Sequence, residues 1–388
     1  MLEICVATNF DDNLIEQISK YGPHELYGKL KTDCVGGGRP AWVLPEVDWE
    51  RVRRHIRIAH KHSTRFNYLL NAVTLGSREA KGYREIRRLM DTVADVGADA
   101  ITVTDPLLLM VAKRYYPQFE VKISIFAGVA TPVQAKLWAD LGADVISPAP
   151  TLVNREFSIL KSIADAFQGP IQLVANNNCI MGCPFTPTHN AFVSQASRSQ
   201  LDAKKPMVDY CMYGCRLMRL TNPELMVKGD WIRPEDLEHY ERVGVKQIKI
   251  VDRSCSTSMI VKRVKAYTER RYDGNLFDIM EQAMIERKRA LEGSRGALAF
   301  YREPVVSIPN RKLDGFIDHF VAHSCMQTDC LKCGYCSEVA ARVVRIDKGK
   351  LKTLSKRYLE EMGRIISGVP DHHASHKREA TTEKTTSD

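Results

Sequence analysis

The sequence predicts an α/β fold: a TIM-like (β/α)8 barrel with a cysteine-rich insertion, followed by a small C-terminal cysteine-rich α domain. Up to about residue 275, eight short segments rich in β-branched residues alternate with amphipathic helical segments. Three helical segments end at Gly97, Gly142 and Gly244, just before the next strand, and glycine there supplies a left-handed helix cap. An open, doubly wound sheet would give a similar alternation and is the alternative.

The individual elements follow from the same alternation. The predicted strands span Ile4–Ala7, Glu25–Tyr27, Phe66–Leu70, Ala100–Val103, Val121–Ile125, Val145–Ser147, Ile171–Val174 and Gln247–Val251. The predicted helices span Val47–His62, Tyr83–Val96, Pro106–Tyr115, Val133–Leu141, Asn154–Phe167, Pro234–Val243 and Ser256–Tyr272, and beyond the barrel Leu276–Leu291.

The chain divides into three parts. At 388 residues it is long enough for a barrel-sized domain with an appendage. The barrel is expected over residues 1–275, with an iron-sulfur insertion at 176–230. A cysteine-rich domain follows at 276–370, and the polar tail 371–388 has no apolar periodicity and is expected to be disordered.

Composition limits the environment and the partners. The chain is 44% hydrophobic and 27% charged, as in a soluble globular protein, and has no run of 18 apolar residues that predicts a membrane span. The N-terminus lacks a basic region followed by an apolar stretch, which predicts a cytoplasmic protein. Its eleven cysteines are then metal ligands or reduced thiols rather than disulfides. The net charge of +9 permits a small anionic substrate or RNA without requiring either.

The insertion carries the strongest chemical signal. Cys179 and Cys183 form one Cys-x3-Cys pair, and Cys211 and Cys215 form another. Four soft thiolates select zinc or an iron-sulfur cluster over hard cations. The alternative is four unrelated core thiols, since free cysteine is often buried.

Other polar segments are expected at the same end of the barrel. Functional residues of such barrels follow the carboxyl ends of the strands. Cys34 and Arg39, with three glycines between them, follow the second strand, and Asp252, Arg253 and Cys255 follow the last. The glycines are consistent with a simple turn or with an anion-accepting nest of backbone N–H groups.

A second cysteine pattern lies beyond the barrel. It contains Cys325, Cys330, Cys333 and Cys336, the last three at two-residue gaps. This spacing is more typical of an iron-sulfur cluster than of the two separated knuckles of a zinc ribbon, which favours iron-sulfur over zinc. Such a cluster is expected to relay electrons or to hold the C-terminal domain in place.

The sequence resembles peptidase family U32, the collagenase-like proteins, over roughly residues 1–270. The resemblance rests on the Cys211-x3-Cys215-Arg216 element, on the helix start at Asp236–Leu237 and on the strand end Ile248–Arg253. In the family that strand usually ends Glu-Gly-Arg, whereas this chain keeps an acid and an arginine, Asp252 and Arg253, without the glycine.

The resemblance implies a chemistry different from the family name. Better understood relatives carry a 4Fe-4S cluster and hydroxylate RNA bases or a quinone precursor without oxygen, in several cases with prephenate as the implied oxygen source. It also implies a rival ligand set: Cys34, one of Cys179 or Cys183, Cys211 and Cys215. Cys255 is a further candidate to complete this site. One or two 4Fe-4S clusters are expected, with zinc as the alternative, and another U32-type protein is a possible hetero- or homo-oligomeric partner.

Roles are assigned to the remaining polar residues by their chemistry. Arg39, Arg216 and Arg253 are expected to bind carboxylates or phosphates, because a guanidinium group pairs with them through two hydrogen bonds. His189 and Asp252 are expected to move protons, with Arg253 beside them in the catalytic pocket.

We therefore predict an oxidoreductase of hydroxylase type that acts on an RNA base or a small biosynthetic intermediate. One alternative is a U32-type peptidase, although the sequence has neither a His-Glu-x-x-His helix nor a Gly-x-Ser-x-Gly elbow. The other is a zinc-stabilised scaffold or RNA-binding protein. The Cys-x3-Cys-x2-Cys triplet typical of radical S-adenosylmethionine enzymes is absent.

Overall fold

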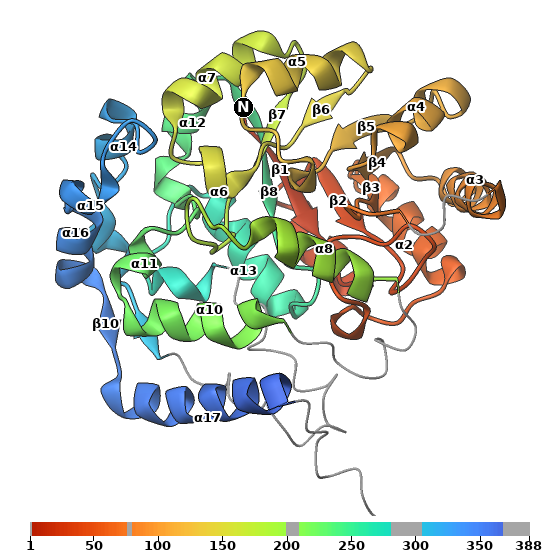
Figure 1. Ribbon diagram of the computed structural model, residues 1–388. Helices are drawn as coiled ribbons and strands as arrows, with labels where there is room; N and C mark the ends of the chain where they lie inside the picture. Colours follow the sequence, from red (N-terminus) through yellow and green to blue (C-terminus); the bar gives the residue numbers. More distant parts are fainter. Residues whose placement is uncertain (1, 76–79, 199–208, 281–304, 368–388) are drawn as a thin grey trace, which may run out of the picture.

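The computed structural model describes residues 2–75, 80–198, 209–280 and 305–367. Eight parallel strands close into a barrel in sequence order (Figure 1). They are β1 (Glu3–Ala7), β2 (Glu25–Gly28), β3 (Arg65–Leu70), β4 (Ala100–Val103), β5 (Glu120–Ile123), β6 (Val145–Ile146), β7 (Ile171–Val174) and β8 (Val245–Ile250). Closure is made by β1 and β8, whose register pairs Glu3 with Gln247 and Val6 with Ile250. The predicted barrel is confirmed, and the doubly wound alternative is wrong.

Helices connect the strands around the outside of the barrel. They are α1 (Asp12–Ser19), α2 (Trp49–Lys61), α3 (Ala80–Asp95), α4 (Pro106–Tyr115), α5 (Pro132–Asp140), α6 (Pro150–Val153), α7 (Phe157–Ala166), α12 (Leu237–Arg242) and α13 (Thr257–Thr268). Short polar side chains cap several of their amino ends, as Asp48 does by accepting a hydrogen bond from the backbone N–H of Arg51. Gly97, Gly142 and Gly244 have φ values of 91°, 96° and 95°, which confirms the predicted left-handed caps.

The insertion is more ordered than its sequence indicated. The segment between β7 and α12 has no clear helical period, yet it contains α8 (Thr186–Ala196), α10 (Tyr210–Thr221) and α11 (Glu224–Val227). No helix is predicted in this stretch from the sequence, because cysteine and glycine interrupt the apolar pattern of α10. The predicted helix Leu276–Leu291 begins instead as a 3-10 turn at Leu276–Asp278, and residues 281–304 and 368–388 lie outside the described residues.

The barrel interior is unusually polar for a core that β-branched residues normally fill. Lys122 and Glu25, both fully buried, form an ion pair with 2.6 Å between Nζ and Oε2. Asn67 donates to the same carboxylate at 2.9 Å. Nearer the carboxyl end, the Lys249 ammonium lies 4.1 Å from the centre of the Tyr27 ring, and burial lowers the pKa of Lys249 to about 8.

The C-terminal part packs on the barrel and shares its hydrophobic core. It contains α14 (Asp318–Ala322), α15 (Cys330–Cys333), α16 (Tyr335–Val343) and α17 (Lys348–Ser367), together with a two-stranded antiparallel sheet of β9 (Val306–Ser307) and β10 (Arg345–Ile346). The sheet was not predicted, because two-residue strands leave no periodicity in the sequence.

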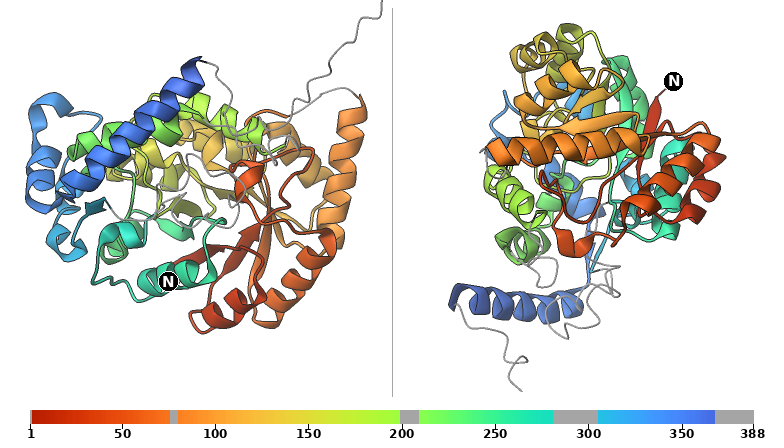
Figure 2. Two further views of the ribbon diagram at one scale, coloured as in Figure 1. Left: turned by 90° about the horizontal axis from the view of Figure 1, so that it is seen from below. Right: turned by 90° about the vertical axis from the view of Figure 1, so that its right-hand side faces the viewer.

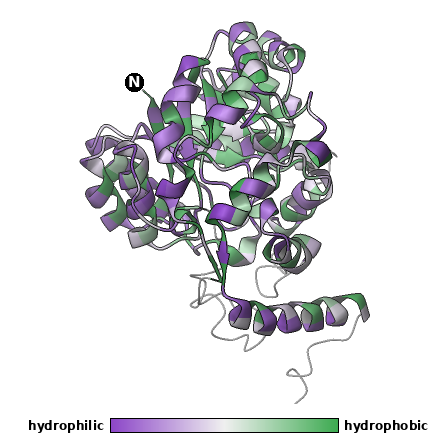
Figure 3. Ribbon diagram, turned by 90° about the vertical axis from the view of Figure 1, so that its left-hand side faces the viewer, coloured by the Kyte–Doolittle hydropathy of each residue, from purple (hydrophilic) through white to green (hydrophobic). Residues whose placement is uncertain are grey.

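Two helix-to-helix contacts place the C-terminal part next to the insertion. Helix α16 packs against α11. Helix α17 runs along α10, and the left view of Figure 2 shows this long blue helix lying over the green helices. The apolar residues concentrate on the strands and on the inner sides of the helices (Figure 3). Among the described helices, none combines the length and the apolar character needed to cross a lipid bilayer.

Candidate metal centre at the barrel mouth

The carboxyl ends of β7 and β8 are tied together next to the first cysteine. The buried Asn176 amide donates to the carbonyl of Val251 at 2.5 Å and accepts from its N–H at 2.7 Å. Asn176 leads into the Cys179 loop, and Val251 precedes Asp252. The loop and the last strand end therefore leave the barrel side by side, as predicted from the strand ends.

The Cys179 loop is held by one buried acid. Asp230 is fully buried, accepts from the Cys179 N–H at 2.8 Å and accepts from the Asn177 amide at 2.6 Å. A carboxylate that accepts a backbone N–H fixes the loop more firmly than a neutral acceptor does. The position of Cys179 thus depends on a residue that lies just beyond α11.

Helices α8 and α10 bring three more thiols into one neighbourhood. Cys183 lies just before α8, and Cys211 and Cys215 lie one turn apart on α10. Burial, Asp209 and then the charges of Cys215 and Cys183 raise the pKa of Cys211 to about 12. Burial likewise raises the pKa of Cys215, with Cys183 adding to the effect. The charge of Cys183 therefore acts on both thiols of α10, which places the three in one neighbourhood.

A buried arginine accompanies the cysteines. Arg219 lies one turn after Cys215 on α10 and is 8% exposed. Two of its nitrogens donate to the carbonyl and side-chain oxygens of Asn178, whereas Nε has no hydrogen-bond partner among the described residues. Burial lowers the pKa of Arg219, and the charges that oppose this come first from Cys215 and then from Cys179. A buried cation therefore lies near Cys215 and the Cys179 loop.

The donor set fits a thiolate-bound metal. Four soft thiols on two short segments, with a buried arginine beside them, suit a centre whose thiolates outnumber the charges of the metal. Cys183, Cys211 and Cys215, with Cys179 from the neighbouring loop, would hold an iron-sulfur cluster, or zinc.

His189 lies beside this set on α8. Its Nδ1 is hydrogen-bonded to Asp209, which also hydrogen-bonds the Cys211 thiol. The ligand atoms of His189, Asp209 and Cys211 all lie within 4.8 Å of one another. This group can contribute a metal ligand or move a proton at the edge of the thiol cluster.

A second group gathers after the ends of β2 and β8. Arg39 approaches Asp252 with 3.2 Å between Nε and Oδ1, and Asp252 also accepts from the Ser254 hydroxyl at 2.8 Å. Arg253 is 4% exposed, and its Nη1 has no hydrogen-bond partner within the described part of the chain. Burial lowers the pKa of Arg253 to about 10, which Asp252 partly offsets. Arg253 therefore keeps one buried nitrogen without a hydrogen-bond partner among the described residues.

The glycine loop is a turn rather than an open nest. The N–H groups of Val35 and Gly36 donate to Asp33 at 3.0 and 2.6 Å, and Gly37 donates to Ser197 at 2.7 Å. Gly36 has φ +83°, and a Cβ there would lie 2.5 Å from the Ser197 hydroxyl, so the turn requires glycine. These donors are already used, which favours the turn over the anion nest.

The remaining predicted residues lie around this mouth. Cys34 is partly buried, and its pKa is raised to about 11 by burial and then by Asp33 and Glu85, rather than by another cysteine. Cys255 accepts from the Arg263 guanidinium at 3.1 Å. Arg216 follows Cys215 on α10, and its charge offsets a small part of the rise in the pKa of that thiol. Sequence reasoning missed Asp209, Arg219 and Asp230; the only signal was the spacing of Arg219, one helical turn after Cys215.

Fold and site together define a parallel barrel with a cysteine-rich centre at the carboxyl end of its strands. The sequence profile described as peptidase family U32 matches residues 43–166. The chain is 29% identical over 316 residues to the uncharacterized protease MJ1657 of Methanocaldococcus jannaschii, covering 81% of this chain and 87% of that protein.

Two further likenesses are more distant. The chain is 23% identical over 131 residues to tRNA hydroxylation protein P of Escherichia coli (strain K12), covering 33% of this chain and 27% of that protein. The solved U32 peptidase Mk0906 superposes with a TM-score of 0.49 at 20% identity, covering 65% of this chain and 93% of that structure. The family match and the long alignment to MJ1657 make the chain similar to peptidase family U32.

Proposed function

We propose that this protein is an oxygen-independent hydroxylase whose barrel mouth holds a 4Fe-4S cluster on Cys179, Cys183, Cys211 and Cys215. The observation that carries the proposal is the thiol cluster with Arg219 buried beside it, because a buried cation needs a negative partner. When bound, such a cluster supplies electron storage and, with an exchangeable coordination position, a place to activate substrate.

The chain's own residues supply the substrate-binding part. Arg253, with its unpartnered nitrogen, binds an anionic co-substrate such as prephenate, with Arg39 and Arg216 at the rim. Asp252 keeps Arg39 in position and is available to move a proton. His189 and Asp209 form a second proton-moving pair beside Cys211.

The substrate is an RNA base or a small biosynthetic intermediate. The partial likeness to tRNA hydroxylation protein P supports an RNA base. The net charge of +9 is compatible with RNA. A heterodimer or homodimer with another U32-type protein is part of this proposal.

A peptidase is the second candidate, and the grouping of Cys211, His189 and Asp209 favours it. A cysteine nucleophile acts as a thiolate, which requires a lowered pKa. Here burial, Asp209 and the neighbouring thiols raise the pKa of Cys211 to about 12. The electrostatics of this thiol therefore favour a metal ligand, whose charge the metal stabilises, over a free nucleophile.

The test is an anaerobic reaction of the iron-loaded protein with either total tRNA or an extract of small aromatic metabolites, each with and without prephenate. Mass spectrometry of nucleosides and metabolites is expected to find a product that has gained one oxygen atom. The double variant Cys211→Ala, Cys215→Ala is the matched control and should form none. If the iron-loaded wild type adds oxygen to no compound in either pool but cleaves a peptide library, the hydroxylase proposal is wrong and the peptidase is supported.

A further inference from the structure

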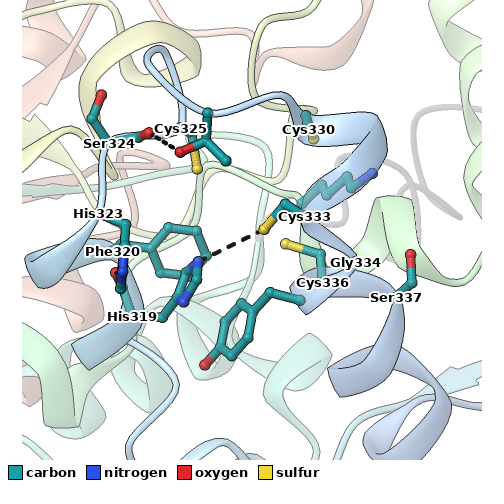
Figure 4. A pocket seen from close by; sticks show the side chains of 13 residues that line it. His319, Phe320, His323, Ser324, Cys325, Cys330, Cys333, Gly334, Cys336 and Ser337 are labelled. Atoms are coloured by element: carbon teal, nitrogen blue, oxygen red, sulfur yellow. Dashed lines mark hydrogen bonds between the residues drawn. The ribbon is translucent and has the colours of Figure 1, made fainter.

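A second thiol cluster lies on the flank of the barrel, away from the strand ends. Cys325, Cys330, Cys333 and Cys336 line one pocket (Figure 4). Two histidines, His319 and His323, and two aromatic rings, Phe320 and Tyr335, line it as well. In the close view the side chains of Cys325, Cys333 and Cys336 point toward the same space.

Local structure explains how the thiols meet. Asp329 caps α15 by accepting from the Leu331 N–H at 3.1 Å, and α15 carries Cys330 and Cys333. Gly334 then turns the chain with φ +69° and starts α16, so that Cys336 falls in its first turn. A left-handed residue between the two helices lets both Cys333 and Cys336 face the pocket.

The barrel holds the remaining cysteine. Glu156, in the connection between α6 and α7, accepts from the Ser324 hydroxyl at 2.6 Å and from the Met326 N–H at 3.1 Å. Cys325 lies between these two contacts. The pocket is therefore assembled from the C-terminal segment and positioned by a barrel residue.

Arg155, next to Glu156, lies buried behind the pocket. It is 1% exposed, and the centre of its guanidinium group lies 4.9 Å from the ring centre of Phe320, which lines the pocket. One nitrogen donates to the Val227 carbonyl at 2.6 Å. Its Nε and Nη2 have no hydrogen-bond partner in the part of the chain that the structure describes.

A buried guanidinium with two unpaired nitrogens is costly unless a negative charge lies nearby. Burial lowers the pKa of Arg155, and the charges that oppose this are, in order, those of Cys336, Tyr240, Asp230 and Cys325. Two of these four are pocket thiols. Four thiolates outweigh the charge of one Zn²⁺ ion or of an oxidised cubane cluster, so a metal-loaded pocket is net negative. Lys228, which follows α11 in the insertion and also lines the pocket, adds a second cation.

We propose that Cys325, Cys330, Cys333 and Cys336 form a second, four-thiolate metal centre, and that the buried Arg155 of the barrel balances its negative charge. The spacing of the last three cysteines favours an iron-sulfur cluster over zinc as occupant. Arg155 is a positioning residue that acts through the centre and fixes it to the barrel. The proposal stands on its own observations and does not depend on the hydroxylase activity.

The first test is metal analysis of the full-length chain purified without oxygen. The double variant Cys333→Ser, Cys336→Ser is expected to lose the iron and sulfide of one centre, or one zinc ion. It should keep the metal of the first centre. The kind of metal lost identifies the occupant. The variant Cys211→Ala, Cys215→Ala should retain the metal that the first variant loses. A Cys333→Ser, Cys336→Ser protein with the metal content of the wild type would overturn the proposal.

The second test addresses Arg155 with variants that separate charge from packing. Arg155→Gln is expected to lose the metal of this centre to a chelator at about 10- to 100-fold lower chelator concentration than the wild type. Arg155→Lys, which keeps the charge, should restore most of the retention. With an iron-sulfur occupant, Arg155→Gln should also shift the midpoint potential of the centre to a more negative value, because the reduced cluster carries more negative charge.

Arg233 is the matched control. It is fully buried in the same barrel face and anchors the same C-terminal part through Asp314 at 2.6 Å. Arg233→Gln should lower the stability of the protein while leaving the potential and the chelator resistance of the folded fraction unchanged. Equal losses of metal in Arg155→Gln, Arg155→Lys and Arg233→Gln would reduce Arg155 to a structural role and overturn its part of the proposal. If Arg155→Gln does not fold, the cysteine variants alone decide whether the centre exists.

Discussion

Each cysteine set of this chain has its own buried arginine. Arg219 lies beside Cys215 and Cys179, and Arg155 lies near Cys336 and Cys325. Both guanidinium groups retain at least one nitrogen without a hydrogen-bond partner among the described residues. Burying two incompletely paired guanidinium groups destabilises the folded protein. Negatively charged metal-thiolate centres are expected to offset this destabilisation.

Neutralising Arg219 tests this at the barrel mouth. Arg219→Gln is expected to weaken metal retention at the first centre by about tenfold, because a second-layer charge typically contributes one to two orders of magnitude in metal affinity. The metal retention of Arg219→Lys should lie between that of Arg219→Gln and that of the wild type. Chelator titration followed by the visible spectrum measures the effect, and unchanged retention in Arg219→Gln would contradict it.

Asp236 gives the protein a distinctive dependence of stability on pH. Burial raises its pKa from 3.8 to about 7, and the nearby Arg233 only partly offsets this. Between about pH 4 and 7 the folded state therefore holds a proton that the unfolded state has lost. The contribution of this residue to the free energy of unfolding should fall as pH rises through that range, by about 1.4 kcal/mol per pH unit at most, and level off above it.

Asp236→Asn removes this titration. Chemical denaturation at several pH values between 4 and 8 should show a flatter decline for the variant than for the wild type. Equal slopes in the two proteins would mean that Asp236 is ionised throughout.

The residues of the two proposed metal centres were only partly predictable. Cysteine spacing identified eight candidate ligands, and strand ends identified Asp252 and Arg253. Arg155 and Asp230 left no trace in the sequence, because their roles depend on segments more than 50 residues away, such as Val227 for Arg155 and Cys179 for Asp230. Such partners follow from the fold and not from local spacing.

At the scale of elements, the Cys179 loop depends on a contact outside α8 and α10. Asp230→Ala removes the acceptor for the Cys179 N–H and leaves a part-buried donor unpaired. The expected loss in the free energy of unfolding is about 1–3 kcal/mol, together with weaker metal retention. Denaturant titration checks the stability, and the exposed surface variant Asp165→Ala should change it by less than about 0.5 kcal/mol. A loss no larger than that of the surface variant would show that other contacts hold the loop.

Helix α17 covers the helix that carries Cys211 and Cys215. Its buried Tyr358 packs against Tyr213 of α10, with ring centres 5.4 Å apart. Tyr358→Ala leaves a cavity under α17 and is expected to lower the free energy of unfolding by about 3 kcal/mol. Its neighbour Leu359 is 57% exposed, so Leu359→Ala is the matched control and should change little. Comparable effects of the two substitutions would mean that α17 does not stabilise α10.

For the molecule as a whole, the barrel could be predicted from the sequence, but the contacts that join its parts could not. Strand bounds such as Ala100–Val103 and Ile171–Val174 match the structure, because buried parallel strands are short runs of β-branched residues between clear helices. The polar interior around Lys122 and Glu25 was not predicted, since periodicity does not distinguish a buried ion pair from an exposed one. The contacts of α16 with α11 and of α17 with α10 link the C-terminal part to the insertion.

Metal and sulfide analysis of the full-length protein, purified without oxygen, tests the central claim that the barrel mouth is a thiolate-bound iron-sulfur centre. We predict about eight iron atoms with matching sulfide per wild-type chain, and about four in the double variant Cys211→Ala, Cys215→Ala. Stoichiometric zinc without sulfide, or an iron content that the double substitution leaves unchanged, would contradict it.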